Sequence, residues 1–240
     1  MVVVQYDGAD YAGFQRQVGR TTIQGELEQA LTRITQETAP IVGAGRTDAG
    51  VHARAQVISF KTTWARPWAE LQRALNAVLP KAIVIQQLQV AAPEFHARRS
   101  AKARTYRYTI NNQSVRSPLR ERFAWHVSQP LDAAAMHAAL QTFIGWHDFV
   151  AFGNAPEQRS STVRDLRAAR CWREVDWALV ELTANAFLQG MVRRIVGALA
   201  QVGSGQMSVT DFAALLPARD KQRVKWKAPP QGLCLWGVEY

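Results

Sequence analysis

Apolar residues recur along the first half of the chain at two spacings, and the spacings predict its elements. Helical spacing predicts one helix over about residues 22–36 and a second that starts near Pro67 and is ended by Pro80. Thr21 and Gln24 form a capping-box pattern before the first helix. β-branched and alternating runs predict strands near residues 1–6, 55–60 and 83–90. The first half is therefore predicted to be β-α-β-α-β.

The second half continues with the same two periods. Strands are predicted at 105–110, around Phe123–Val127, at 163–172 and at 177–184, and from Leu233 to Tyr240. Asp132 is a predicted N-cap of one helix, and a second helix is predicted over about 188–202. We expect an α+β fold of two ferredoxin-like subdomains, residues 1–103 and 104–240, each with helices on one face of a sheet.

Composition and charge narrow the class of partner. The chain has 240 residues and a formal net charge of +10, with a sequence pI of about 10.2. So basic a chain predicts a polyanionic partner, nucleic acid first and an anionic membrane surface second. No apolar run approaches the roughly 20 residues of a membrane helix. The start of the chain predicts a first strand rather than a signal peptide.

The two cysteines, Cys171 and Cys234, stand far apart, and neither has a Cys or His partner at metal-ligand spacing. We therefore expect free thiols, a reducing cytoplasmic location and no bound metal.

The span from Phe95 to Arg120 contains no acidic residue, which predicts either a track for phosphates or a basic linker between the halves. Loop arginines near the N-terminus could also meet phosphates. The candidate RNA-binding residues are Arg16, Arg20, His52, Arg98, Arg99, Lys102, Arg104 and Arg107.

The stretch Gly43–Ala53 is the strongest candidate for chemistry. Gly45 and Gly50 bracket Arg46-Thr47-Asp48, and a strand-like run follows, so one carboxylate could be presented on a rigid support. An ordinary turn, in which the Asp side chain satisfies its own backbone, explains the spacing equally well.

The run from Gly45 to Ala53 resembles the signature of the TruA class of tRNA pseudouridine synthases. Three further segments resemble the same family, in the expected order and over nearly the whole chain: Tyr6-Asp7-Gly8 through Gln17, Thr105-Tyr106-Arg107-Tyr108, and Phe187-Leu188 with Met191-Val192-Arg193. The resemblance implies that the two sheets join into one mixed, mostly antiparallel central sheet, with the active cleft between the halves. It also implies a homodimer that isomerises uridines 38, 39 and 40 in the anticodon stem-loop of tRNA, without cofactors.

The resemblance carries roles to individual residues. Asp48 matches the catalytic carboxylate, which could act as a nucleophile or as a base. Arg193 matches its ion-pair partner, and Arg46 matches the residue that helps to displace the flipped base. Tyr106 matches the active-site tyrosine, whose ring would stack on the uracil. Phe187 and Leu188 would line the pocket.

The chain departs from the family pattern at Phe14, where a tryptophan is usual, at Ala186 in place of a glycine, and at Gln189-Gly190. These changes affect the pocket shape and the start of the last predicted helix. They leave the four active-site residues named above in place.

Two other classes of function fit parts of the sequence. A non-catalytic RNA-binding protein would use the same scaffold and charge. A hydrolase acting on a glycosidic bond usually needs two carboxylates, and Asp7 or Asp10 would have to join Asp48.

Overall fold

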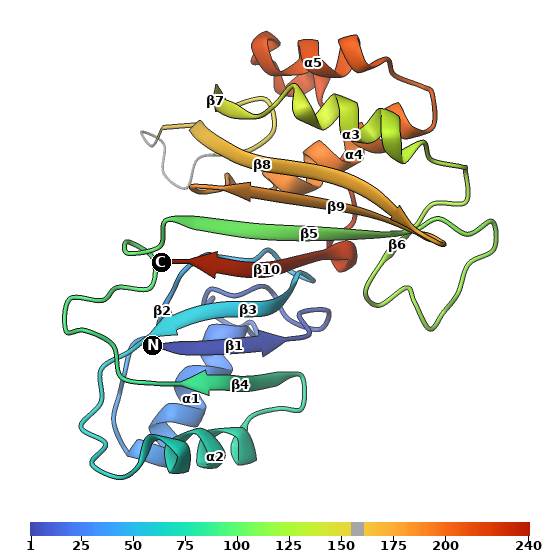
Figure 1. The fold of residues 1–240 in the computed structure, drawn as a ribbon. Helices are drawn as coiled ribbons and strands as arrows, with labels where there is room; N and C mark the ends of the chain where they lie inside the picture. Colours follow the sequence, from blue (N-terminus) through green and yellow to red (C-terminus); the bar gives the residue numbers. More distant parts are fainter. Residues whose placement is uncertain (155–160) are drawn as a thin grey trace. The chain divides into compact units, whose positions relative to one another are not determined.

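A computed structural model of the chain describes residues 1–154 and 161–240. Over these residues it contains ten strands and five α-helices, which confirms the predicted α+β class. The chain divides into two compact units: unit 1 comprises Met1–Lys102 with Leu235–Tyr240, and unit 2 comprises Ala103–Cys234. Figure 1 shows the elements of each unit.

The sheet of unit 1 is built on the first strand of the chain. β1 (Val2–Tyr6) pairs antiparallel with both β3 (His52–Ser59) and β4 (Ile83–Leu88). β10 (Leu233–Glu239) lies beside β3, so the order is β4-β1-β3-β10, and the short β2 (Val42–Gly43) also pairs with β3. The Gly45–Ala53 stretch therefore begins just after β2 and enters β3.

Two helices complete unit 1, and both follow the predicted spacing. α1 (Ile23–Thr35) buries Ile23, Leu27 and Leu31, and α2 (Trp68–Val78) packs on α1 and along β4. The predicted capping box was wrong by one residue, because Thr22 is the N-cap and accepts a hydrogen bond from the Gly25 N–H at 3.2 Å. The Gln24 side chain instead accepts from the Arg16 N–H at 3.0 Å, outside the helix.

The sheet of unit 2 has the order β5-β9-β8-β7. These strands are β5 (Ala103–Asn111), β9 (Trp177–Ala184), β8 (Val163–Glu174) and β7 (Gly145–Asp148), and neighbours are antiparallel. The strand predicted around Phe123 was too long: only β6 (Trp125–His126) pairs with β5, in parallel. Phe123 itself is 53% exposed. It lies in a turn rather than in a strand, because its N–H donates a hydrogen bond to the Arg120 carbonyl.

Three helices belong to unit 2. α3 (Ala133–Gln141) packs on β8 and contacts both α4 (Met191–Gly203) and α5 (Val209–Ala218) (Figure 1). The predicted N-cap of α3 is confirmed, since Asp132 Oδ1 accepts from two backbone N–H groups. Short 3-10 turns lie at Lys221–Arg223 and Pro230–Gly232.

Two details of these helices differ from the prediction. α4 starts three residues later than expected, because Gly190 precedes it in the left-handed conformation with φ +74° and ends the incoming segment. α5 was not predicted, although Ser208 caps it by accepting from the Asp211 N–H at 3.0 Å. That Ser-x-x-Asp pattern was the available signal.

Candidate active site

The loop that follows β2 presents its side chains to opposite sides. Arg46 is exposed, Thr47 is buried at 6% exposure, and Asp48 is half-buried. The Asp48 carbonyl accepts from the Val51 N–H at 3.2 Å, and Gly50 closes this turn with φ +75°. The loop therefore displays an arginine and a carboxylate while anchoring the residue between them.

A second loop, residues 7–14, lies directly against this turn. The Phe14 N–H donates to the Thr47 carbonyl at 3.0 Å, and the Gly50 N–H donates to the Tyr11 carbonyl at 3.3 Å. At Gly8 the two backbones are so close that a Cβ atom would lie 2.0 Å from the Val51 carbonyl oxygen. Backbone contacts on both sides of Asp48 therefore fix its position within unit 1.

His52 lies inside unit 1, at 5% exposure. Its Nδ1 is 3.1 Å from the Gly8 backbone nitrogen and 3.0 Å from Asp7 Oδ1. A neutral ring accepts from the Gly8 N–H, and a protonated ring donates to Asp7. In either form His52 ties β3 to the 7–14 loop, and it engages Asp7, one of the two acids that a hydrolase would need.

In unit 2, Tyr106 contacts one of the two predicted pocket residues, Phe187. Tyr106 is 7% exposed, and its ring meets Phe187 edge to face with centroids 5.1 Å apart. Leu188 is buried, and a Cβ atom on Gly153 would lie 2.4 Å from its Cβ. The structure thus brings Tyr106 and Phe187 into contact, while Leu188 packs against Gly153.

Arg193 lies in the first turn of α4, where the segment after α5 fixes it. Its Nε donates to the Ala228 carbonyl at 2.8 Å, and its own carbonyl accepts from the Ala228 N–H at 2.9 Å. Tyr108 donates from its hydroxyl to the next carbonyl, that of Pro229, at 2.7 Å. Burial raises the pKa of Tyr108 well above its usual value, and the positive charge of Arg193 opposes that rise.

The predicted RNA-binding residues divide by exposure. Arg104 is buried and donates to the Asn185 carbonyl at 2.9 Å, so it holds β5 to the segment after β9. Arg16 is exposed and lies 3.4 Å from Glu28. The remaining residues, apart from Arg107 and His52, are exposed side chains of unit 1: Arg20, Arg98, Arg99 and Lys102.

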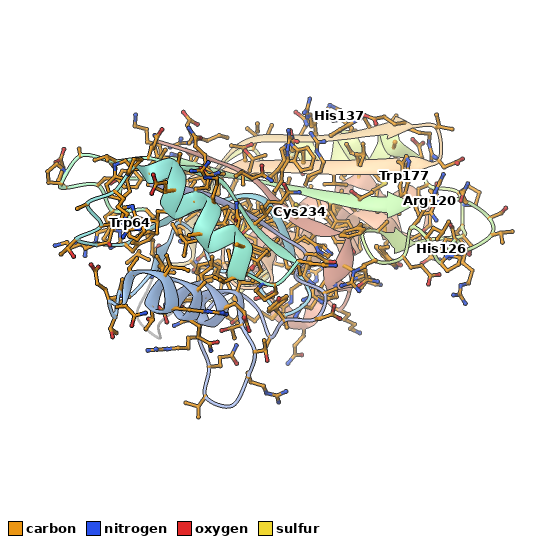
Figure 2. All side chains as sticks on the ribbon, turned by 90° about the horizontal axis from the view of Figure 1, so that it is seen from below. Trp64, Arg120, His126, His137, Trp177 and Cys234 are labelled. Atoms are coloured by element: carbon orange, nitrogen blue, oxygen red, sulfur yellow. The ribbon has the colours of Figure 1, made fainter. Side chains whose placement is uncertain are left out.

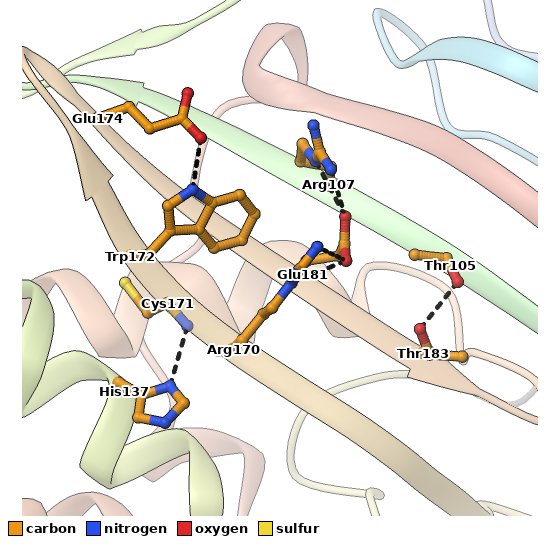
Figure 3. A network of polar contacts seen from close by, with 9 residues as sticks. All are labelled: Thr105, Arg107, His137, Arg170, Cys171, Trp172, Glu174, Glu181 and Thr183. Atoms are coloured by element: carbon orange, nitrogen blue, oxygen red, sulfur yellow. Dashed lines mark hydrogen bonds and ion pairs between the residues drawn. The ribbon is translucent and has the colours of Figure 1, made fainter.

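Arg107 belongs to a polar network on the sheet of unit 2 (Figure 3). It donates to Glu181 Oε2 from Nε at 3.0 Å and from Nη2 at 2.8 Å, while Arg170 Nη2 lies 2.7 Å from the other oxygen, Oε1. Both guanidinium groups also lie over the Trp172 ring. One carboxylate on β9 therefore binds two arginines from the strands on either side, β5 and β8, and the three groups together carry a net charge of +1.

Another polar cluster lies where β5 ends. Arg120 lies over the Trp177 ring, 4.5 Å from its centroid (Figure 2), and His126 Nε2 lies 2.9 Å from the Gln113 carbonyl oxygen. A hollow of about 520 Å³ is lined by Asn112, Gln113, Ser114, Val115, Arg116 and Asp176. The sequence reasoning did not single out this cluster as a site.

Sequence reasoning also missed two buried polar groups next to the Asp48 loop, Gln56 and the hydroxyl of Tyr6. Gln56 Nε2 donates to the Gly45 carbonyl at 2.8 Å, and Tyr6 Oη lies 2.8 Å from Thr47 Oγ1. The only available signal was a glutamine among apolar residues of a predicted strand.

Within residues 1–154 and 161–240, no group of three or more His, Cys, Asp or Glu side chains is arranged to hold a metal ion. No helix in this part of the chain combines the length and the apolar content that crossing a bilayer requires. Neither Cys171 nor Cys234 forms a disulfide, and Cys171 is buried.

Known proteins match most of the chain that carries these residues. A family model described as tRNA pseudouridine synthase matches residues 2–100 and 139–240, which include Asp48 and Arg193 but not Tyr106. The tRNA pseudouridine synthase A of Thermoanaerobacter sp. (strain X514) is 40% identical over 240 residues, covering 100% of this chain and 98% of the relative.

Two further relatives carry the same name. That of Roseiflexus sp. (strain RS-1) is 44% identical over 99% of this chain and 88% of its own length, and that of Brevibacillus brevis is 41% identical over 99% and 98%. Among solved structures, one chain of a Cbf5-Nop10-Gar1 complex aligns with 83% of this chain and 54% of its own, at 12% identity. Its TM-score of 0.32 is too low to bear on function.

Proposed function

This chain belongs to the tRNA pseudouridine synthase family, and from that premise we propose that it modifies uridines 38, 39 and 40 in the anticodon stem-loop. It is an isomerase that converts uridine in tRNA to pseudouridine. In this reaction the C1′–N1 glycosidic bond breaks, the uracil turns, and a C1′–C5 bond forms while C5 gives up its proton and N1 gains one. No atoms are gained or lost overall, so no redox partner is consumed.

Asp48 is the proposed catalytic carboxylate. The observation that carries this proposal is the way its loop is held: backbone hydrogen bonds on both sides of Asp48 leave a half-buried carboxylate on a fixed support. A fixed position is what a group acting on a single carbon or proton requires. The fixed position of Asp48 suits two mechanisms: addition of the carboxylate to a carbon, and removal of a proton by the carboxylate.

The family match assigns the other roles. Arg193 is the proposed ion partner that keeps Asp48 charged and oriented, and its own guanidinium is held in place by Ala228. Tyr106 would stack on the uracil, with Phe187 and Leu188 as the pocket wall. Exposed Arg46 would fill the space that the flipped base leaves, since a guanidinium plane can stack like a base.

Substrate binding would rest on exposed basic residues of unit 1. Exposed Arg20, Arg98, Arg99 and Lys102 supply charge for phosphates on a chain of net charge +10. Extracting a base costs a few kcal/mol and least near a loop, which favours an anticodon arm over a long duplex. A tRNA is large for one chain, so we also propose a homodimer, and a cytoplasmic location follows from the tRNA substrate.

The decisive experiment compares wild type, D48N and D10N on an anticodon stem-loop RNA. Pseudouridine is mapped by reverse transcription after carbodiimide treatment, and free uracil is measured by chromatography. We expect pseudouridine at positions 38–40 from wild type and D10N and none from D48N, because exposed Asp10 has no proposed role. Equal product from D48N would refute Asp48 as the catalytic group, and free uracil would favour hydrolysis.

The proposed partner is tested by two adjacent arginines of α4. R193A should lower the rate steeply, whereas R194A, which removes a 3.5 Å hydrogen bond to the Phe152 carbonyl, should stay near the wild-type rate. Equal rates for the two variants would remove Arg193 from the mechanism.

A further inference from the structure

Gln56 is a fully buried amide in the middle of β3. Its side chain is 0% exposed, it lies opposite Val4 of β1, and Val57 and Ile58 after it are also buried. An amide in such surroundings is costly unless its donor and acceptor are both satisfied. The partners of Gln56 therefore indicate its role.

Those partners are the two peptide groups of Gly45. Gln56 Nε2 donates to the Gly45 carbonyl at 2.8 Å, and the Gly45 N–H donates to Gln56 Oε1 at 3.4 Å. The β2–β3 ladder itself ends one residue earlier, where the Ala44 N–H donates to the Val57 carbonyl at 2.8 Å. The Gln56 side chain thus continues the ladder into the loop, at the residue where the strand backbone no longer reaches it.

Tyr6 holds the loop at its next buried position. Tyr6 is 2% exposed. Its hydroxyl lies 2.8 Å from Thr47 Oγ1, and Gln56 Nε2 lies 3.5 Å from the same hydroxyl. A hydroxyl that accepts from Gln56 still has its own proton to donate to Thr47. The two side chains therefore form one buried chain of hydrogen bonds that ends at Gly45 and Thr47.

We propose that Gln56 and Tyr6 are positioning residues for the isomerisation. By fixing Gly45 and Thr47, they set the backbone from which Arg46 points outward and on which Asp48 follows. This inference rests on the proposed function, since it takes Asp48 to be the catalytic carboxylate. A displacement of about 1 Å at a reacting group can cost about 100-fold in rate.

The test uses the full-length protein, an anticodon stem-loop RNA and single-turnover kinetics with enzyme in excess. Q56M keeps the side-chain length without polar atoms, and Y6F removes only the hydroxyl. We expect Q56M to lower the rate about 10- to 100-fold, while the Kd for the RNA stays within about twofold of wild type. Because the network acts as a unit, Y6F added to Q56M should lower the rate little further.

Q56E provides a readout that a merely structural role would not move. The ionised carboxyl group that it introduces cannot donate to the Gly45 carbonyl, whereas its protonated form can. Because position 56 is fully buried, the pKa of a carboxyl group there should lie well above its ordinary value of about 4.3. The rate of Q56E relative to wild type should therefore recover as the pH falls from 8 to 6. The titratable groups on the packed elements are Tyr6 on β1, His52 on β3, and Arg46 and Asp48 on the loop, and the wild-type profile corrects for them.

Asn76 of α2 is the matched control. It makes the same two-point pairing with a peptide group, donating to the Ile85 carbonyl at 2.9 Å and accepting from the Ile85 N–H at 2.8 Å, on a different strand of unit 1. N76L should lose stability yet keep the wild-type rate.

The outcomes separate the two proposals. A wild type that forms no pseudouridine refutes the proposed function itself. With an active wild type and an inactive D48N, a wild-type rate in Q56M overturns the positioning role, and so does a Q56E profile parallel to wild type. If Q56M does not fold, Y6F and the Q56E profile decide between the same two results.

Discussion

Gly13 and Thr47, far apart in sequence, meet backbone to backbone: a Cβ atom on Gly13 would lie 2.8 Å from the Thr47 carbonyl oxygen. Gly13 also has φ +100°, a conformation that side chains rarely adopt. This contact places the 7–14 loop directly against Thr47, the residue that precedes Asp48. The position of the proposed catalytic loop therefore depends on the absence of a side chain at residue 13.

The G13A variant should be markedly less stable than wild type. Left-handed strain of about 1–2 kcal/mol adds to the displacement of backbone atoms, which costs about 1–3 kcal/mol by analogy with overpacking. Urea unfolding measures this loss. G19A is the matched control, since Gly19 has φ +69° but nothing within 4 Å of its Cβ position, so it should lose only the left-handed strain of about 1–2 kcal/mol. Equal losses would show that the close approach contributes nothing.

Cys171 should resist alkylation in the folded protein. Burial raises the pKa of its thiol to about 12, so at pH 8 the reactive thiolate is nearly absent. Iodoacetamide labelling followed by mass spectrometry should find Cys171 unmodified in the native chain and modified in urea. Labelling of the native chain at the urea rate would contradict the burial.

The same pKa shift predicts a loss of stability at high pH. Above the ordinary thiol pKa of 9.0 the unfolded chain releases this proton, while the folded chain keeps it until about pH 12. The contribution of Cys171 is therefore complete below pH 9 and falls as the pH rises. In C171S the decline measured by urea unfolding between pH 8 and 10.5 should be shallower than in wild type.

The E181Q variant should destabilise unit 2 more than its single charge suggests. Glu181 is partly buried and pairs with both Arg107 and Arg170, so neutralising it removes the anion that the two arginines share and should cost about 1–3 kcal/mol. E121Q breaks an exposed pair with Arg116 and should change stability by less than about 1 kcal/mol. Thermal unfolding measures the stability loss of both variants. Equal losses would contradict the prediction.

Exposed and paired arginines should differ in the salt dependence of RNA binding. Alanine at Arg98, Arg99 or Lys102 should reduce the slope of log K against log salt by about 0.7 to 0.9 for each phosphate that the protein no longer neutralises. R107Q should leave the slope unchanged, because two hydrogen bonds hold the Arg107 guanidinium on Glu181 and use Nε and Nη2, donors that a phosphate would need. Filter binding over a range of KCl concentrations measures each slope. A reduced slope in R107Q would show that Arg107 does contact RNA phosphates.

The local pattern of residues determined a large part of this protein. Helical spacing located α1, α2 and α4, and alternation located β5, β8 and β9, because one face of each element is buried and leaves a periodic trace. The Gly45–Ala53 signature and the segments around Tyr106 and Arg193 were sufficient to identify the family. The start of α4 was missed by three residues because a single left-handed glycine decides it.

Only the tertiary structure decided what holds the proposed catalytic loop. Tyr6 reaches Thr47 across 41 positions, and Gln56 reaches Gly45 across 11. The tertiary structure also showed that Arg104 is buried and that Arg107 is paired with Glu181, although the two arginines stand in a basic run of the sequence. The physical reason is that a buried polar group takes its partner from whichever segment the fold brings near, and local periodicity records only whether a position is buried.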